Sequence, residues 1–318
     1  MTANTGAIGT AAPATKTAGR GPRLDREARW GLVFISPWLV GFFLFMALPM
    51  AASLYLSFTD FDPRAPGEAQ FVGLQNYQRM LRDPVFLESL WVTIKFAVLI
   101  VPATLAFALG IAVLVNSTLL AGRNIFRTLF YVPVQIPLVA STIVWIGVLN
   151  ASNGWINLGF EALGLTGPDW LNSTFWVYPS LTFMGLWGIG TMMLIFLAGL
   201  QGVPSDLYEA ARVDGAGRWK TFRHITIPMI STVMFYNLII VLIGTFQYFT
   251  QAYIITQGRG DPDGATLFYN LNLFNEAFVY FDMGYASALA WLLFVIVLAL
   301  TALLFRTARS WVYEAGTR

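Results

Sequence analysis

The chain has 318 residues, of which 57% are hydrophobic and only 11% are charged, with a net charge of +2. Soluble domains carry about 25% charged residues, so this composition excludes a soluble globular protein and indicates an integral membrane protein. So small a net charge does not indicate a nucleic-acid partner. Cysteine is absent and His224 is the single histidine, which excludes disulfides, cysteine metal sites and a histidine cluster.

Residues 1–29 are rich in Ala, Thr and Gly and become basic toward their end. This composition predicts a disordered tail that ends in a positive cluster beside the membrane. The apolar run that follows, at about 32–58, exceeds the roughly 7–15 apolar residues of a signal peptide, so we interpret it as an uncleaved first membrane helix. The basic residues of the tail are Lys16, Arg20, Arg23, Arg26 and Arg29.

Six apolar segments meet the requirement of roughly 20 residues for one membrane crossing. Prolines inside some of them do not exclude this interpretation, because kinked helices are tolerated in bundles. The predicted fold class is therefore all-α, a polytopic membrane protein with six transmembrane helices. The membrane domain spans 30–310, with helices at about 32–58, 91–115, 125–149, 176–200, 229–255 and 284–306, before a tail at 311–318.

The charges of the connecting segments predict the orientation of the chain. Basic residues gather before the first helix, after the second, between the fourth and fifth, and after the sixth. The alternate loops are acidic or mixed, and residues 150–175 contain two acids but no Lys or Arg. Because basic loops stay on the cytoplasmic side, both termini and the central loop at 202–228 are expected in the cytoplasm.

The central loop, GVPSDLYEAARVDGAGRWKTFRHITIP, is predicted to contain two short helices. Asp206 is expected to cap the first helix, and Glu209 lies three residues later, where it would complete a capping box. Gly215 and Gly217 supply the backbone freedom to end that helix and turn. A second short helix is expected at 218–225, before the membrane boundary at Pro228.

This loop resembles the EAA loop of ABC importer permeases. The pattern is Glu-Ala-Ala, three residues, Gly215, nine residues, then Ile225-x-x-Pro228, with Ile227 in place of the usual leucine. In that family the loop holds a coupling helix that docks on a cytoplasmic ATPase subunit. The resemblance assigns ATPase coupling to Glu209, Ala210, Ala211, Asp214, Gly215, Ala216 and Pro228.

Two further segments resemble the carbohydrate-uptake branch of the same family, the maltose and glycerol-phosphate type. They are FVGLQNYQRMLRDPVFLESL at 71–90 and DMGYASALAW at 282–291. The resemblance implies a type I importer permease fold in the cell membrane of a prokaryote. It also implies a second permease subunit, two ATPase subunits and an extracytoplasmic sugar-binding protein. ATP and magnesium would be used by the ATPase subunits, with no cofactor bound by this chain.

The sequence also bears on the source of energy. It contains no Gly-x-x-x-x-Gly-Lys-Ser/Thr loop for ATP and no acidic residue inside the apolar segments for a proton or ion relay. A transporter without either must take its energy from a partner. The alternatives are a glycerol-3-phosphate permease, which would need basic groups along its path, an independent channel or facilitator, and, more weakly supported, a membrane enzyme.

Polar and aromatic residues inside the apolar segments are candidates for a substrate path. Thr245 and Tyr248 are three residues apart and Trp187 and Thr191 are four apart, so each pair is expected to share one helix face. Packing between helices is the alternative role, since small and polar residues are common there. The candidate path residues are Trp187, Gly188, Thr191, Gly244, Thr245, Tyr248 and Gln251, with Gln135, Thr142 and Trp145 on the third helix.

The predicted orientation is testable because the natural chain has no cysteine to mutate first. We expect a cysteine at Ser173 to react with an impermeant maleimide in intact cells, and one at Thr221 to react only after the membrane is permeabilised. Reaction at Thr221 in intact cells would contradict the orientation.

Overall fold

The computed structural model describes residues 26–117 and 120–313, with side chains described from Trp30 onward. The tail predicted at 1–29 therefore lies outside the described residues apart from the backbone of its last turn, as do the final five residues of the C-terminal tail. The described residues form helices and connections, with one isolated β-bridge as their only extended pairing. The predicted all-α class is confirmed.

The chain divides into two units, Met1–Ala52 and Ser53–Arg318. The first contains α1 (Arg26–Phe42), a π-helical turn at Phe43–Ala47 and the start of α2 (Leu48–Leu56). Together these elements form one apolar helix, Trp30–Leu56, that is long enough to cross a membrane. The π-helical turn lies just before Pro49, which has no N–H for the regular helical hydrogen bond.

The second unit contains the remaining helices. They are α3 (Gln75–Met80), α4 (Pro84–Asn116), α5 (Arg123–Tyr131), α6 (Leu138–Val148), α7 (Trp155–Ala162), α8 (Val177–Trp187), α9 (Gly190–Gln201), α10 (Ser205–Val213), α11 (Arg218–Thr221), α12 (Ile227–Met229), α13 (Ser231–Phe246), α14 (Thr250–Thr256), α15 (Tyr269–Phe274) and α16 (Met283–Ala308). Short 3-10 helices lie at Pro66–Glu68 and Val132–Gln135, and π-helical turns at Phe222–Thr226 and Asn275–Val279.

Four helices of the described chain are long and apolar enough to cross a membrane, or six if each of two bent pairs counts as one span. The membrane segments predicted at 125–149 and 176–200 are each a pair of helices joined at a sharp bend. The first is bent by 102° between Gln135 and Leu138, and the second by 60° between Trp187 and Gly190. Pro137 explains the first bend, because it holds Ile136 in an extended conformation. Gly188 caps α8 and so ends the helical path at the second bend.

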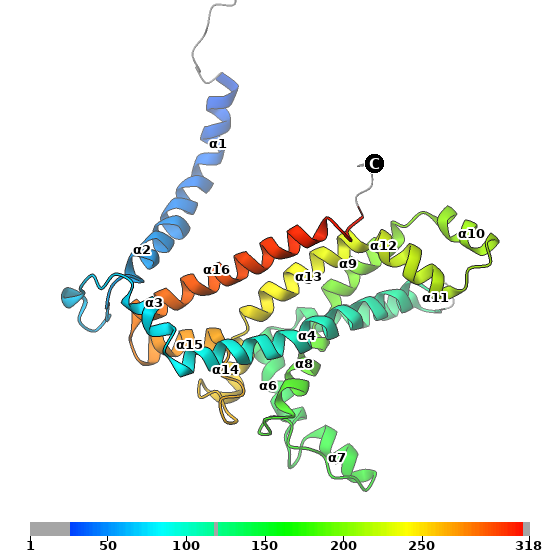
Figure 1. Cartoon of the computed structure of the whole chain (residues 1–318). Helices are drawn as coiled ribbons and strands as arrows, with labels where there is room; N and C mark the ends of the chain where they lie inside the picture. Colours follow the sequence, from blue (N-terminus) through cyan, green and yellow to red (C-terminus); the bar gives the residue numbers. More distant parts are fainter. Residues whose placement is uncertain (1–25, 118–119, 314–318) are drawn as a thin grey trace, which may run out of the picture. The chain divides into compact units, whose positions relative to one another are not determined.

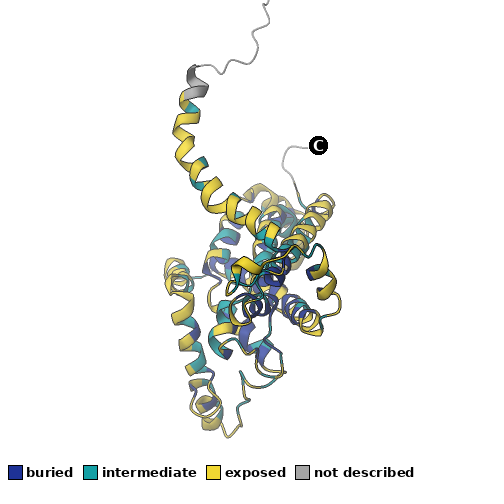
Figure 2. Cartoon of the chain, turned by 90° about the vertical axis from the view of Figure 1, so that its left-hand side faces the viewer, coloured by how far each residue is buried: buried dark blue, intermediate teal, exposed yellow. Residues whose placement is uncertain are grey.

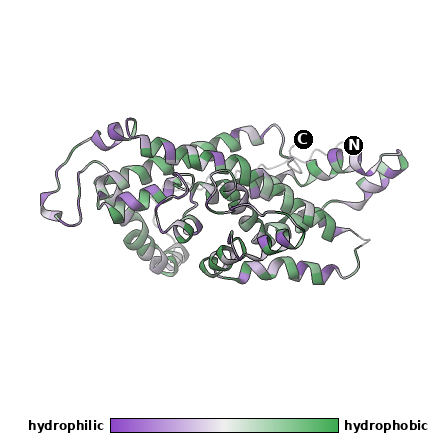
Figure 3. Cartoon of the chain, turned by 90° about the horizontal axis from the view of Figure 1, so that it is seen from below, coloured by the Kyte–Doolittle hydropathy of each residue, from purple (hydrophilic) through white to green (hydrophobic). Residues whose placement is uncertain are grey.

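Helix α4 is the centre of the second unit and packs against α8, α9, α13 and α15. Figure 1 shows α4, α13 and α16 running in similar directions, with α10 and α11 at one end and α3, α14 and α15 at the other. Buried residues gather where these helices face one another (Figure 2), and hydrophobic residues cover most of their length (Figure 3). The side chains form two cores, one around Phe96 and Tyr285 and one around Met193 and Ile230.

Gly190 lets α9 approach the end of α5 closely. A Cβ atom at Gly190 would lie 2.4 Å from the carbonyl oxygen of Phe130 and 2.8 Å from the Cα of Tyr131. Both are backbone atoms, so the helices would have to separate to admit a side chain. A Cβ atom at Gly110, inside α4, would meet no atom within 4 Å. The two glycines are thus a matched pair, one required by packing and one free to change.

We expect Gly190→Ala to lower the melting temperature of the purified protein in detergent, because overpacking of this kind costs about 1–3 kcal/mol. Gly110→Ala should leave it unchanged or raise it, since alanine favours a helix over glycine by roughly 0.5–1 kcal/mol. Equal melting temperatures for the two variants would contradict the close approach of α5 and α9.

Candidate functional site

The helix α10 begins differently from the sequence prediction. Its first residue is Ser205, Pro204 precedes it as the N-cap residue, and no side chain caps it. Asp206 is therefore already inside the first turn, so the predicted capping box of Asp206 and Glu209 is wrong. Pro204 causes the shift, because its extended backbone (ψ 133°) starts the helix one residue earlier. Asp206 still stabilises the helix, because its negative charge in the first turn interacts favourably with the positive end of the helix dipole.

The end of α10 is a Schellman motif built on Gly215. The N–H of Ala216 donates to the carbonyl of Ala211 at 2.9 Å, and the N–H of Gly215 donates to that of Arg212 at 3.1 Å. These two bonds require a left-handed residue, and Gly215 has φ +72°. The prediction that Gly215 ends the helix is confirmed. Gly217 has ordinary extended angles (φ −68°, ψ 161°) and does not share this role.

The loop is held against the membrane helices along one side and open along the other. Ala211 is buried, and the hydroxyl groups of Tyr208 and Thr226 lie 3.1 Å apart, which joins α10 to the second helical segment. On the open side Val213 is 87% exposed and Trp219 is 70% exposed. The loop therefore presents large apolar side chains on its surface, which is a property of protein contact sites.

Between the two helical segments lies a groove of about 750 Å³. Its lining includes Tyr208 and Arg212 from α10, Trp219 and Phe222 from the second segment, and Val113 near the end of α4. The rings of Trp219 and Phe222 stack at 5.9 Å. Glu209 and Arg212 form an exposed pair at 4.0 Å, and a pair of this kind adds little to stability. The carboxylate of Glu209 is thus available to another partner.

From this loop an almost unbroken helical path leads into the membrane domain. The segment from Arg218 passes through a π-helical turn and α12 to α13, with only Ile230 outside a helix before Phe246. Pro228 lies inside this path, where its missing N–H accounts for the π-helical turn just before it. The helix therefore continues through Pro228, and the apolar span long enough to cross a membrane begins just after it, at Ser231. The path thus connects the loop to α13 with almost no interruption of the helix.

The predicted pairs of path residues do not each share one helix face. Trp187 ends α8 whereas Thr191 lies in the first turn of α9, beyond the 60° bend. Thr245 lies in α13, but Tyr248 lies in the break between α13 and α14. The steps of three and four residues assumed continuous helices. Helix breaks at these points separate the members of both pairs.

The individual path candidates differ in exposure. Trp187 is 48% exposed and its ring meets Trp145 at 5.7 Å, edge to face. Tyr248 packs against Phe96 and Phe268, both at 4.9 Å, and its buried hydroxyl has no partner among the described residues. The hydroxyl of Thr245 is bonded within its own helix. Gly188, Thr191 and Gly244 are exposed, and Gln251 is half-buried.

The third, fourth and fifth membrane segments each contain a break in the helix at or beside a candidate path residue. The breaks follow Gln135, Trp187 and Phe246. In a bilayer, irregular backbone occurs only where it is buried in protein or lines a water-filled cavity, because its polar groups need partners. The packing of α14 against α6, together with the contact of Trp145 with Trp187, brings parts of the three segments together.

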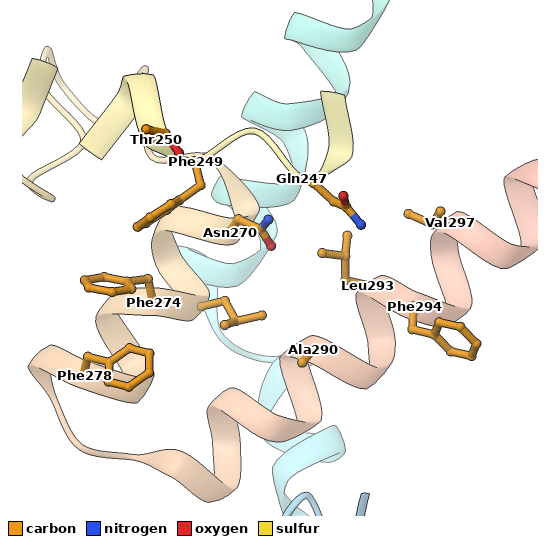
Figure 4. A pocket seen from close by; sticks show the side chains of 11 residues that line it. Gln247, Phe249, Thr250, Asn270, Phe274, Phe278, Ala290, Leu293, Phe294 and Val297 are labelled. Atoms are coloured by element: carbon orange, nitrogen blue, oxygen red, sulfur yellow. The ribbon is translucent and has the colours of Figure 1, made fainter. Parts of the chain in front are cut away.

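A cavity of about 570 Å³ opens beside the break between α13 and α14 (Figure 4). Gln247 and Asn270 turn their amides into the opening, and the rings of Phe249, Phe274 and Phe278 form one side. We call it the membrane cavity. Apolar walls with few polar groups are typical of small-molecule sites. Sequence analysis missed Asn270 and Phe274, which lie in α15, between the last two membrane segments.

Sequence analysis also did not identify two polar residues of α8 as candidates for the path. Tyr178 and Thr182 lie on one face of α8, and each has a buried hydroxyl without a partner among the described residues. Tyr178 lies near Phe96, the same ring that contacts Tyr248. Their four-residue spacing in an apolar segment places both on one helix face, and the sequence analysis could have identified them by that spacing. No group of three or more His, Cys, Asp or Glu suited to a metal occurs in the part of the chain that the structure describes.

Comparisons with known proteins agree with this arrangement. The family model described as "Binding-protein-dependent transport system inner membrane component" matches residues 105–313. The chain is 43% identical over 292 residues to the probable ABC transporter permease protein YesP of Bacillus subtilis, covering 89% of this chain and 91% of the relative. It is 33% identical over 288 residues to the trehalose/maltose transport system permease protein MalF of Thermococcus litoralis, covering 89% and 95%.

A solved structure shows the fold. A chain in the crystal structure of a bacterial alginate ABC transporter in complex with an alginate pentasaccharide-bound periplasmic protein matches with a TM-score of 0.77. The match covers 90% of this chain and 96% of that chain at 20% identity. The type I importer permease fold expected from the sequence is thus confirmed.

The unpaired hydroxyl of Tyr248 generates a prediction about stability. We expect Tyr248→Phe to leave the melting temperature in detergent unchanged or to raise it, because a buried hydroxyl without a partner contributes no hydrogen bond. Tyr269→Phe is the matched control. The hydroxyl of Tyr269 donates to the carbonyl of Leu289 at 2.8 Å, so its loss should cost about 0.5–1.5 kcal/mol. A larger loss for Tyr248→Phe than for Tyr269→Phe would contradict the assignment.

Proposed function

Since the chain belongs to the family of binding-protein-dependent transport system inner membrane components, we propose that it is the permease subunit of an ATP-driven importer for a neutral carbohydrate. One observation carries this proposal. Nine-tenths of the chain aligns with permeases of ABC transporters, and one of these is a trehalose/maltose permease. A match of this extent includes both the central loop and the membrane helices.

The central loop is the proposed link to the ATPase. Exposed Val213 and Trp219 and the carboxylate of Glu209 offer an apolar contact with one charged group beside it. Ala210, Asp214 and Ala216 complete the short, turned segment, and the Schellman motif at Gly215 holds its direction. When the ATPase subunits close, the loop moves, and the helical path through Pro228 to α13 transmits the displacement to the break at Gln247–Phe249.

The proposed substrate path runs along the helix breaks. Tyr248, Trp187 and the amides of Gln247 and Asn270 offer rings and hydrogen-bonding groups of the kind that a sugar requires. Gly188, Thr191, Gly244, Thr245 and Gln251 lie beside the same breaks and are proposed as further wall residues. The interior has few charged groups, which favours a neutral sugar over glycerol phosphate. This chain would carry out no covalent chemistry and bind no cofactor.

The proposed assembly is a second permease, two cytoplasmic ATPase subunits that use ATP and magnesium, and an extracytoplasmic sugar-binding protein. The loop is then cytoplasmic, as are both termini. Figure 1 shows α10 and α11, the helices that carry Arg212 and Arg218, at one end of the bundle and α3 and α15 at the other. The basic residues of the central loop support a cytoplasmic position for the first end. A channel or facilitator remains the alternative from another class, and it would copurify without an ATPase.

We expect Gly215→Val to abolish both sugar uptake and the ATPase stimulation that the loaded binding protein causes. Valine at a positive φ is strained by about 1–3 kcal/mol, so the turn after α10 would be lost. Glu209→Lys should reduce the same stimulation by reversing the charge that the loop presents, while α10 remains folded. Both are measured on the complex in proteoliposomes.

The matched control is Gly217→Val. Gly217 lies two residues away with a negative φ, and a Cβ atom there would meet nothing within 4 Å. This variant should keep stimulated ATPase activity and uptake. Normal stimulation in Gly215→Val and Glu209→Lys would show that the loop is only a connector and would favour the channel.

A further inference from the structure

A second cavity, of about 470 Å³, lies at the end of the bundle opposite the central loop. It is formed by the end of α14, the turn after it, α15 with the following π-helical turn, and the start of α4, which gather at that end in Figure 1. We call it the outer cavity. Its volume falls within the roughly 300–1,000 Å³ of small-molecule sites. By the proposed orientation it faces the extracytoplasmic side.

Polar side chains that are themselves buried line the outer cavity. Asn272, Asn275 and Glu276 are 2%, 8% and 8% exposed. Asn275 donates to the carbonyl of Gly258 at 2.8 Å, which fixes its amide against the turn after α14. The amide nitrogen of Asn272 has no hydrogen-bond partner among the described residues. Burying such groups costs free energy, so a cavity lined by three of them needs a reason beyond packing.

The carboxylate of Glu276 is only weakly neutralised. Its nearest cation is Arg79, with nitrogen and oxygen 3.8 Å apart, which is too far for a hydrogen bond. Arg79 is closely paired with Asp282 instead, and its guanidinium lies 3.9 Å from the centre of the Tyr285 ring. Burial raises the pKa of Glu276, and Arg79 partly opposes that shift. Glu276 is therefore a strong hydrogen-bond acceptor held at the cavity wall.

Aromatic rings form part of the wall. Tyr253 is 39% exposed and Tyr280 is 60% exposed, and both line the cavity. The ring of Tyr253 also contacts Phe249 at 5.4 Å and Phe274 at 5.2 Å. Those two phenylalanines line the membrane cavity. A continuous row of rings thus connects the outer cavity to the membrane cavity.

The chemistry of this wall selects the class of ligand. A carboxylate, three side-chain amides and the guanidinium of Arg259 offer both acceptors and donors, and hydroxyl groups satisfy both. The rings offer flat apolar surface beside them. A metal ion would need more acidic ligands, and the described residues hold no such group here. Arg259 is paired with Asp261 at 2.7 Å, so the weakly paired charge at the wall is that of Glu276, which would repel an acidic sugar.

We propose that the outer cavity is a second carbohydrate site, which binds one neutral sugar ring at the mouth of the path through Glu276, Asn272 and Tyr280. This inference rests on the proposed function, since it requires a neutral sugar that arrives from the extracytoplasmic side. The row of Tyr253, Phe249 and Phe274 then leads the sugar from the outer cavity to the membrane cavity.

The test measures sugar binding to the full complex in nanodiscs, without nucleotide and without the binding protein. The probes are radiolabelled trehalose and maltose, with glucuronate as a competitor, in equilibrium dialysis. We expect saturable binding that glucuronate does not displace. Glu276→Gln should weaken it about tenfold, because an amide replaces a charged acceptor of nearly the same shape. Tyr280→Ala, at an exposed position, should weaken it several-fold without affecting the fold.

The control is Glu161→Gln, the same chemical change at an exposed acid of α7, which should bind the probes as the wild type does. No saturable binding, or unchanged binding in both Glu276→Gln and Tyr280→Ala, would overturn the inference. A loss of affinity for the binding protein with sugar binding intact would identify a protein-docking site instead, and would also overturn it. Uptake by wild-type proteoliposomes, measured in parallel, separates these results from a failure of the proposed function.

Discussion

The need to pair every backbone polar group within a membrane is the constraint on which this structure depends. Most of the chain meets it with helices, of which α4, α13 and α16 are long. The chain departs from it at three internal breaks, after Gln135, Trp187 and Phe246. The break at Gln247–Phe249 lines the membrane cavity, whereas residues 135–140 and 187–188 are exposed on this chain and need a neighbouring subunit or water to satisfy their backbone groups. The same constraint therefore explains both the scaffold and the position of the proposed path.

The two ends of the second unit differ in how their charges are arranged. At the end with the central loop, the charged residues are exposed and pair loosely, as Glu209 does with Arg212. At the other end, Arg79 holds Asp282 closely and lies over the ring of Tyr285, whose hydroxyl donates to Asp83 at 2.7 Å. The first arrangement leaves groups available to a partner. The second joins α3, α4 and α16 and stabilises the walls around the outer cavity.

The helical path from Arg218 to Phe246 connects these properties. It begins at the loop that resembles a coupling helix and ends at the break beside the membrane cavity. The hydroxyl contact between Tyr208 and Thr226 joins α10 to this path. A nearly continuous helix with the proposed coupling loop at one end and a cavity at the other is suited to the proposed coupling of an ATPase to a transport path.

The sequence by itself determined the properties that depend on composition and on short-range pattern. Apolar length predicts the membrane segments, the distribution of arginine and lysine predicts the orientation, and Gly215 predicts the end of α10 because few other residues tolerate a positive φ. Only the tertiary structure decided where the membrane helices bend and which side chains meet across them. Trp187 and Thr191 are separated by a bend that four-residue spacing does not reveal. Val85 lines the outer cavity together with Asn272 and Glu276, which lie nearly 200 residues later in the chain. Such contacts depend on how the helices pack and not on the local sequence pattern.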